Sequence, residues 1–279
     1  MSTLRIQRGL NLPLPGATPK GPFVDRMGTG TVGLLPGESH GIKTKMLVEE
    51  GQTVKVGTPL YCDRRDEAVL FTSPVAGHVL AVVRGARRKV LSVQVQASGI
   101  DDQVSSDISE LDSTNFQVRT SAAEERESLN LPDLDSANND AIRIALLASG
   151  LWPSLRRRPF DRVARSDETP DAIFVTASDT HPQAPAPLDV LAGREADFSA
   201  GLRVLRSLTE GAVYVCTLAG EDWSNFLTEG VQHQVFAGKH PAGNAGVHIN
   251  ALHPVGAARF VWHIGYQDLA DIGQLFRTK

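Results

Sequence analysis

The chain has 279 residues, of which 41% are hydrophobic and 22% are charged, and its formal net charge is −4 at pH 7. This composition is typical of a globular protein, and the length exceeds that at which one core usually divides into domains. The negative charge argues against a general nucleic-acid binder, and the longest apolar runs are too short to span a bilayer. We expect no secretory signal, and the two cysteines, Cys62 and Cys216, form no CxxC pair, which fits a reducing compartment.

Residues 1–30 are rich in Gly and Pro, and we expect them to wrap over the surface. The stretch Gly28–Gly33, at the boundary with the next segment, matches the GxGxxG pattern of dinucleotide sites. No buried strand precedes it, however, and Pro36 follows where the phosphate-binding helix should begin. We therefore interpret the glycines as a turn that leads into a strand.

Residues 31–100 are expected to form a small all-β domain. Two runs of turn residues, Glu50–Gly57 and Ser73–Val79, are each followed by alternating apolar residues, which predicts short strands. The stretch resembles a biotinyl/lipoyl-type barrel-sandwich domain.

In carriers of that fold, a lysine on the tight turn between the two halves takes the prosthetic group. The matching stretch here, Tyr61–Thr72, contains Arg64 and Arg65 but no lysine. A guanidinium is protonated at pH 7 and is a poor acyl acceptor. We therefore expect this domain to be a docking surface rather than a swinging-arm carrier.

An acidic junction is expected at residues 101–138, followed by an α/β domain at 139–279. Asn139 or Asp140 is expected to cap a helix that Gly150 ends. Buried strands are predicted at 172–178, 212–218, 232–238 and 258–265, with helices at 196–211 and 266–276. Strands that alternate with helices predict a mixed α/β fold whose second domain has a mostly parallel, Rossmann-like sheet. Because the chain stops directly after an apolar helical face, we also expect further C-terminal domains.

The densest unusual segment is Leu151–Phe160, where Trp152, three arginines and Phe160 follow the end of a helix. Arginines beside aromatic residues could hold an anionic or planar ligand, or an acidic partner. The alternative is that Trp152 and Phe160 plug the core while the arginines are solvated or paired.

Two further clusters are weaker. Histidines in and after His240–His248 hint at a metal, but their spacing fits no zinc signature, and loop histidines bonded to backbone carbonyls are the alternative. The glycines of this loop would let backbone approach a ligand or another chain closely. Ser178–His181 contains Ser, Asp and His, yet no GxSxG elbow is present, so we expect no catalytic triad.

These segments together resemble one family, the A subunits of the bacterial sodium-translocating NADH:quinone reductase. The resemblance covers essentially the whole chain. Its marks are Gly9–Pro13, Thr72–Gly77, Arg84-Gly85, Ser149–Trp152, Leu155-Arg156, Arg158–Phe160, Ala172–Ala177, His240–Gly243 and Tyr266–Asp268.

The resemblance implies a peripheral subunit on the cytoplasmic face of the bacterial inner membrane. The complex has six subunits, passes electrons from NADH to ubiquinone and exports sodium. This subunit would contribute to quinone binding or to assembly and would hold no redox centre, so the isolated chain would be inactive. FAD, FMN, riboflavin and iron–sulfur centres are expected on other subunits. Family members are longer, and the missing part would hold a β-grasp-like and a helical domain.

Two groups of site residues follow from the resemblance. The first, called here the contact set, is expected to touch quinone or a partner subunit; it consists of Leu35, Gly37, His40, Ile42, Trp152, Leu155, Arg156, Arg158 and Phe160. The second, His240, Gly243 and Gly246, lies near a lost flavin or NADH site.

The family is also similar to flavin- and NADH-binding subunits of complex I and of the Rnf complex. In those relatives a glycine-rich loop meets phosphates where this chain has the bulky Leu151–Phe160 segment, so we expect the flavin site to be lost. A flavin- or NADH-binding subunit of an Rnf-type or complex I-like complex is the alternative function.

Overall fold

The computed structural model describes residues 3–16, 18, 30–98, 126–134, 136 and 138–278. The chain divides into two compact units: a barrel unit of residues 24–129 and 148–150, and an α/β unit of residues 1–23, 130–147 and 151–279. Much of the predicted acidic junction, and Gly28 and Thr29 of the GxGxxG pattern, fall outside the described residues. The described part, Gly30–Gly33, leads into β2 (Thr31–Leu34), as interpreted from the sequence.

The barrel unit consists of two antiparallel sheets. The first has the order β2 (Thr31–Leu34), β8 (Val90–Ala97), β7 (Gly77–Arg84) and β4 (Thr53–Val54), and the second has the order β3 (Thr44–Met46), β5 (Pro59–Asp63) and β6 (Asp66–Thr72). Short 3₁₀ turns occupy Pro36–Glu38 and Ala86–Arg88. Leu60, Val93 and Val95 are fully buried, which confirms that the alternating apolar residues form strands around a core.

Arg64 and Arg65 lie on the hairpin turn between β5 and β6, where a carrier domain would present its lysine. Both are tied to the preceding loop. The backbone N–H of Arg64 donates to the Lys43 carbonyl at 2.7 Å, and the Arg65 guanidinium donates to the Gly41 carbonyl. The hairpin is thus held against its own domain.

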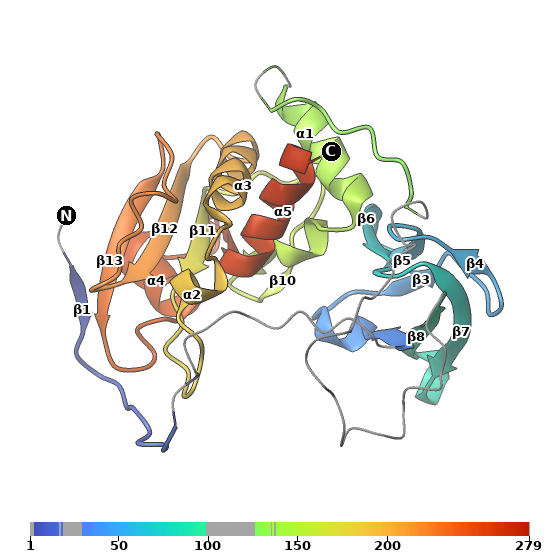
Figure 1. Cartoon of the computed structure of the whole chain (residues 1–279), viewed down its shortest axis with the longest axis horizontal. Coiled ribbons are helices and arrows are strands. Elements are labelled where there is room, and N and C mark those ends of the chain that lie inside the picture. The colour runs from blue at the N-terminus through green and yellow to red at the C-terminus, as the bar shows by residue number, and fades with distance from the viewer. Residues whose placement is uncertain are drawn as a thin grey trace, which may run out of the picture. The chain divides into compact units, whose positions relative to one another are not determined.

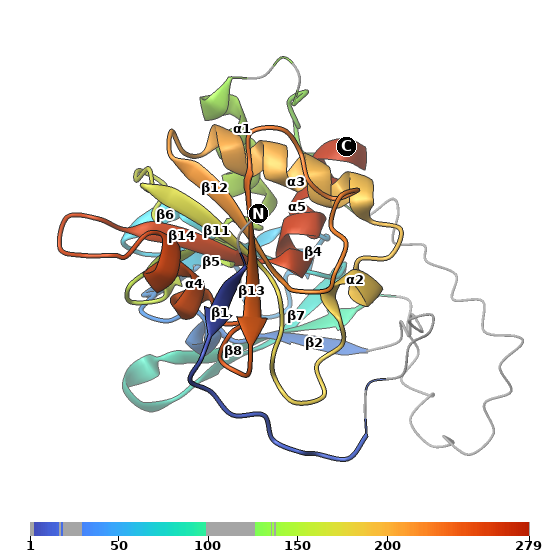
Figure 2. The ribbon, with the colours of Figure 1, turned by 90° about the vertical axis from the view of Figure 1, so that its left-hand side faces the viewer.

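The α/β unit is built on a seven-stranded sheet (Figures 1 and 2). Its order is β1 (Leu4–Ile6), β13 (Gln232–Gly238), β12 (Ala212–Leu218), β11 (Ala172–Ala177), β14 (Val261–Gly265), β9 (Arg156–Arg158) and β10 (Arg162–Val163). The first five are parallel and the last two antiparallel, which confirms the prediction of a mostly parallel sheet. Residues Leu4–Ile6 extend the sheet edge, a role that the Gly- and Pro-rich composition does not indicate.

The helices are α1 (Asn139–Ser149), α2 (Pro187–Val190), α3 (Glu195–Ser207), α4 (Ala245–Leu252) and α5 (Tyr266–Thr278), with a 3₁₀ turn at Trp152–Ser154. The cap of α1 is Asn138, whose Oδ1 accepts from the N–H of Ala141 at 2.7 Å, so the prediction of Asn139 or Asp140 is wrong. Gly150, with φ of +78°, ends α1 as predicted. The predicted helix at 196–211 ends earlier, at Ser207.

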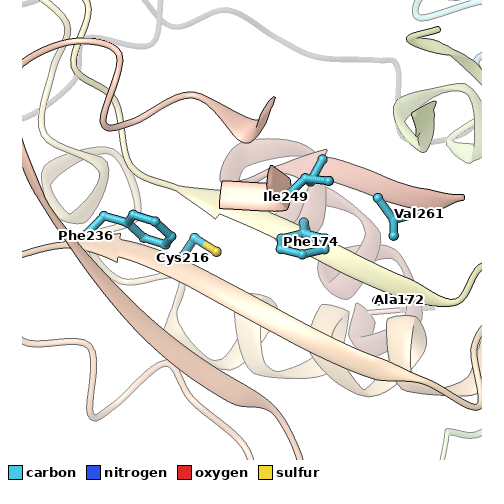
Figure 3. Packing of buried hydrophobic residues seen from close by; sticks show 6 residues of the cluster. All are labelled: Ala172, Phe174, Cys216, Phe236, Ile249 and Val261. Carbon is cyan, nitrogen blue, oxygen red and sulfur yellow. The ribbon is translucent and has the colours of Figure 1, made fainter. Parts of the chain in front are cut away.

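Both faces of the parallel sheet are buried. On one face, Phe174, Cys216 and Phe236 pack beneath Ile249 of α4 (Figure 3). On α3 and α5, Gly201 and Gly273 let the two helices pack closely, because a Cβ on either would collide with backbone of the other helix. No helix in the described part of the chain is both long and apolar enough to cross a membrane.

Candidate functional site

A cleft of about 620 Å³ opens in the α/β unit at the carboxyl ends of β11 and β14. A volume of this size suits a small-molecule site. The lining residues come from the end of β9, the ends of β11 and β14, the turn after β13, and the starts of α4 and α5. They are Arg158, Thr176, Ser178, Asp179, His181, Pro241, Gly243, Asn244, Ala245, Gly246, Val247, His263, Gly265, Tyr266 and Gln267.

The strand order explains why the cleft lies there. The chain runs from β11 to β12 and β13 on one side, then crosses back through α4 to β14 on the other side of β11. The connection from β13 passes through α4 on one face of the sheet, whereas the connections after β11 and β14 lead to α3 and α5, which pack against each other. Such a switch point leaves a crevice at the carboxyl ends of the strands, the usual ligand site of open α/β sheets.

The N-terminus of α4 opens onto this cleft without a side-chain cap. Asn244 occupies the N-cap position but makes no capping hydrogen bond, and no acidic residue lies in the first turn. Within the described residues, the amides of Ala245 and Gly246 have no hydrogen-bond partner. Amides in this position carry the positive end of the helix dipole.

Arg158 reaches the same place from β9. Its Nη2 lies 3.2 Å from the point where a Cβ on Gly246 would be, so the glycine allows the guanidinium to approach the first turn of α4. Arg158 also pairs with Asp161, with Nη1 and Oδ1 3.5 Å apart. A cation therefore lies beside the positive end of a helix, an arrangement that favours an anion between them.

Asp161 interacts with both His263 and Arg158. Its Oδ1 accepts from His263 Nε2 at 2.9 Å and lies near Arg158. The hydrogen bond from His263, with the nearby guanidiniums of Arg158 and Arg156, lowers the pKa of Asp161 to about 2. The carboxylate is therefore ionised at neutral pH.

On the other wall, Asp179 follows β11 and bonds to His181. Its Oδ1 accepts from the backbone N–H of His181 at 2.8 Å and lies 2.7 Å from Nδ1 of the same residue. Burial raises the pKa of Tyr266, and the charge of Asp179 adds to that shift. Ser178 instead donates to the Gly243 carbonyl at 3.3 Å, so Ser178, Asp179 and His181 do not form a nucleophile relay, as expected from the sequence.

The contact-set residues of the α/β unit differ in exposure. Trp152 and Leu155 are fully buried, so the core interpretation holds for Trp152, and neither side chain is presented at the surface. Phe160 is 65% exposed, so the suggestion that it plugs the core is wrong. Arg156 and Arg158 are partly buried, and of these two Arg158 lines the cleft.

The other contact-set residues belong to the barrel unit. They lie around the 3₁₀ turn at Pro36–Glu38. Leu35 is 46% exposed, Gly37 and His40 are exposed, and Ile42 is partly buried.

The second predicted group lies at the cleft. Gly243 and Gly246 line it, and His240 is adjacent, with Nδ1 3.0 Å from Thr180 Oγ1. Gly246 belongs to α4 rather than to a loop. His248 bonds to the Ala242 carbonyl at 2.8 Å. This agrees with the predicted alternative to metal binding, a histidine bonded to a backbone carbonyl. Within the described residues, no group of three or more His, Cys, Asp or Glu side chains is placed to hold a metal.

The sequence pattern does not single out Thr176, His263 and Tyr266 as residues of one cleft. Thr176 lies next to the end of one predicted buried strand, Tyr266 directly follows another, and His263 lies in the middle of that second strand. Because parallel strands end at the same edge of a sheet, a position at a strand end is the feature of the sequence that could have indicated a cleft residue.

Comparisons with known proteins agree with this two-domain architecture. A family model described as the NqrA N-terminal barrel-sandwich hybrid domain matches residues 4–98, and one described as the NqrA second alpha/beta domain matches residues 137–279. The barrel-sandwich prediction is thereby confirmed.

Similar curated proteins are named as the A subunit of the Na(+)-translocating NADH-quinone reductase. The chain is 38% identical to that of Saccharophagus degradans over 275 residues, and 39% identical to that of Serratia proteamaculans over 279 residues. It is 37% identical to that of Neisseria meningitidis over 275 residues. Each match covers 99% of this chain and 57% of the relative. The chain therefore belongs to the NqrA family and corresponds to somewhat more than half the length of these relatives.

Proposed function

We propose that the chain acts as the A subunit of a Na⁺-translocating NADH:ubiquinone reductase. The observation that carries this proposal is the match to both NqrA domain models in chain order. The complex would couple NADH oxidation and ubiquinone reduction to sodium export. The chain would work beside the other five subunits as a peripheral component on the cytoplasmic face of the membrane. This match favours the proposal over a flavin- or NADH-binding subunit of an Rnf-type or complex I-like complex.

Within that complex, the chain would contribute to quinone binding or assembly and would itself hold no redox centre; the flavins and iron–sulfur centres would lie on other subunits. Two features support this division of labour. The barrel hairpin presents Arg64 and Arg65 where a carrier has lysine, and both are bonded to the preceding loop. In the α/β unit, strands β13, β12, β11 and β14 lie in the order expected of a Rossmann-like sheet. Trp152 and Leu155 pack into its core, in the segment that the resemblance matches to the glycine-rich loop of flavin-binding subunits.

The exposed members of the contact set are the residues most available to a ligand or partner. Leu35 and Phe160 are 46% and 65% exposed. The Arg162 guanidinium lies 5.8 Å from the centre of the Phe160 ring. Apolar surface next to hydrogen-bonding groups suits the amphipathic headgroup of a quinone or the core of a subunit interface.

A ubiquinone analogue with a photoreactive group is expected to label this subunit in the assembled complex. The labelled peptides should contain Leu35–Ile42 or Arg156–Phe160, because these stretches carry the accessible contact-set residues. Mass spectrometry of the digested subunit measures the label, and excess unlabelled ubiquinone should remove it. Label confined to the membrane subunits would contradict quinone binding by this chain.

Replacing Phe160 by alanine is expected to weaken assembly while leaving the fold intact. An exposed aromatic residue contributes little to folding, whereas truncating a residue that anchors an interface costs about 2 kcal/mol or more of binding free energy. The measurement is the yield of this subunit recovered with an affinity-tagged partner subunit.

Ile144→Ala is the matched control, because Ile144 is 66% exposed on α1 of the same unit and lies outside the contact set. Equal recovery of the two variants would count against a docking role for Phe160.

A further inference from the structure

We propose that the cleft of the α/β unit binds a phosphate-bearing small molecule, with the phosphate at the first turn of α4. This goes beyond the proposed function, because ubiquinone carries no phosphate and none of the flavin sites is placed on this chain. A nucleoside monophosphate is the ligand class that best fits the cleft, whose volume is about 620 Å³.

Hydrogen-bond donors from two elements meet in this cleft. The amides of Ala245 and Gly246 begin α4, and within the described residues neither has an acceptor. Arg158 of β9 directs Nη2 toward Gly246, while its ion pair with Asp161 uses Nη1 at 3.5 Å, longer than a charged N–H···O hydrogen bond. A phosphate offers three terminal oxygens, which matches these donors better than the two oxygens of a carboxylate.

A buried hydroxyl points to a ligand independently of the helix N-terminus. Oγ1 of Thr176 is buried at the end of β11, lines the cleft and has no hydrogen-bond partner within the described residues. A buried hydroxyl without a partner costs free energy, and a ligand oxygen in the cleft would supply one.

The charges around the cleft are compatible with an anion. Asp179 carries the one carboxylate among the lining residues, and its Oδ1 already accepts from the backbone and ring of His181. Asp161, outside the lining, is occupied by His263 and Arg158. The remaining acceptor capacity of Asp179 could take a ribose hydroxyl, as acidic residues do in nucleotide sites of this sheet type.

The test compares AMP, inorganic phosphate and adenosine by isothermal titration calorimetry with the 279-residue chain. AMP should bind at least about tenfold more tightly than adenosine, because each charge-assisted hydrogen bond to phosphate contributes about 1.5–3 kcal/mol. Inorganic phosphate should compete with AMP. Equal affinity for AMP and adenosine, or no binding of AMP and phosphate at millimolar concentration, would overturn the proposal.

Two variants locate the site. Arg158→Gln should weaken AMP binding at least about tenfold. Arg162→Gln, which changes an exposed arginine outside the cleft, should leave it unchanged. Gly246→Asp should abolish AMP binding through a carboxylate beside Arg158, while the helix N-terminus tolerates that charge, so the protein should stay folded. AMP binding that survives both Arg158→Gln and Gly246→Asp would place the ligand elsewhere and overturn the proposal.

Discussion

Replacing Trp152 by alanine is expected to lower the free energy of unfolding by about 3–5 kcal/mol. The indole is fully buried, and its Nε1 donates to the Ala164 carbonyl at 2.8 Å. Its ring meets Trp262 edge to face with centroids 5.5 Å apart. The alanine variant would lose these contacts, leave a cavity and leave the buried Ala164 carbonyl without its hydrogen bond. Urea unfolding followed by circular dichroism measures the loss.

Phe160→Ala is the matched control, because it truncates the other aromatic residue of the same segment. Its ring is 65% exposed, so the free energy of unfolding should change by no more than about 0.5 kcal/mol. Trp152→Phe should fall between the two, since it keeps a buried ring but loses the hydrogen bond. Equal, small losses of the free energy of unfolding for Trp152→Ala and Phe160→Ala would mean that Trp152 is not a core residue. Trp152 would then be available for the contact that the sequence predicts for it.

This pair of residues shows where reading the sequence reaches its limit. Trp152 and Phe160 both flank an arginine run, and their types do not distinguish a core aromatic from an exposed one. Their difference arises from tertiary structure. The chain turns at Trp152–Ser154 and enters β9, which pairs with β14 and brings Trp152 against Trp262. That pairing joins segments that lie far apart in the sequence.

The secondary structure that could be predicted is the part with a strong local pattern. The strands at 172–177 and 212–218 are apolar runs, as expected for strands covered on both faces, whereas the strand at 232–238 begins with three polar residues and has a weaker pattern. Helix α4 is not predicted, because it has only eight residues, Gly246 lies in its first turn and Gly243 shortly precedes it. Strand β1 is only three residues long and owes its conformation to the edge of β13.

The candidate site can be predicted only in pieces. The sequence singles out Arg158, Gly243 and Gly246, but it assigns Arg158 to a partner surface and the glycines to a lost cofactor loop. The structure brings Arg158 and Gly246 together, because β9 and β14 lie on one side of β11 and the connection from β13 crosses to them. Strand order is a long-range property, so no local pattern in one sequence reveals that these residues line one cleft.

Acidification is expected to destabilise the α/β unit through His248. The imidazole is fully buried on α4, with its ring 4.2 Å from that of Phe236. Nε2 bonds to the Ala242 carbonyl at 2.8 Å, which assigns the proton to Nε2, and the buried Nδ1 has no partner within the described residues. Protonation would therefore place an uncompensated charge in the core, near the positive end of α4. Burial accordingly lowers the pKa of His248 to about 4 from 6.5.

The sign of the pH effect follows from this lowered pKa. Between pH 6.5 and about 4 the unfolded chain binds a proton at His248 that the folded chain does not, so folding stability falls as the pH falls. The free energy of unfolding that depends on a neutral His248 is fully present above pH 6.5 and is lost progressively as the pH falls to about 4. The total loss is about 3 kcal/mol. The measurement is the urea midpoint of unfolding as a function of pH.

His248→Gln isolates the effect, because the glutamine amide can still donate to the Ala242 carbonyl but does not titrate. Burial also lowers the pKa of His233, which makes folding stability fall with pH in the same direction. The wild-type protein and the His248→Gln variant share this effect, so it does not separate their curves. The curves of stability against pH should therefore diverge below pH 6.5, with the wild-type protein losing more stability than the variant. Parallel curves would show that His248 takes up its proton equally in the folded and unfolded states, and hence that the ring is not sealed between α4 and the sheet.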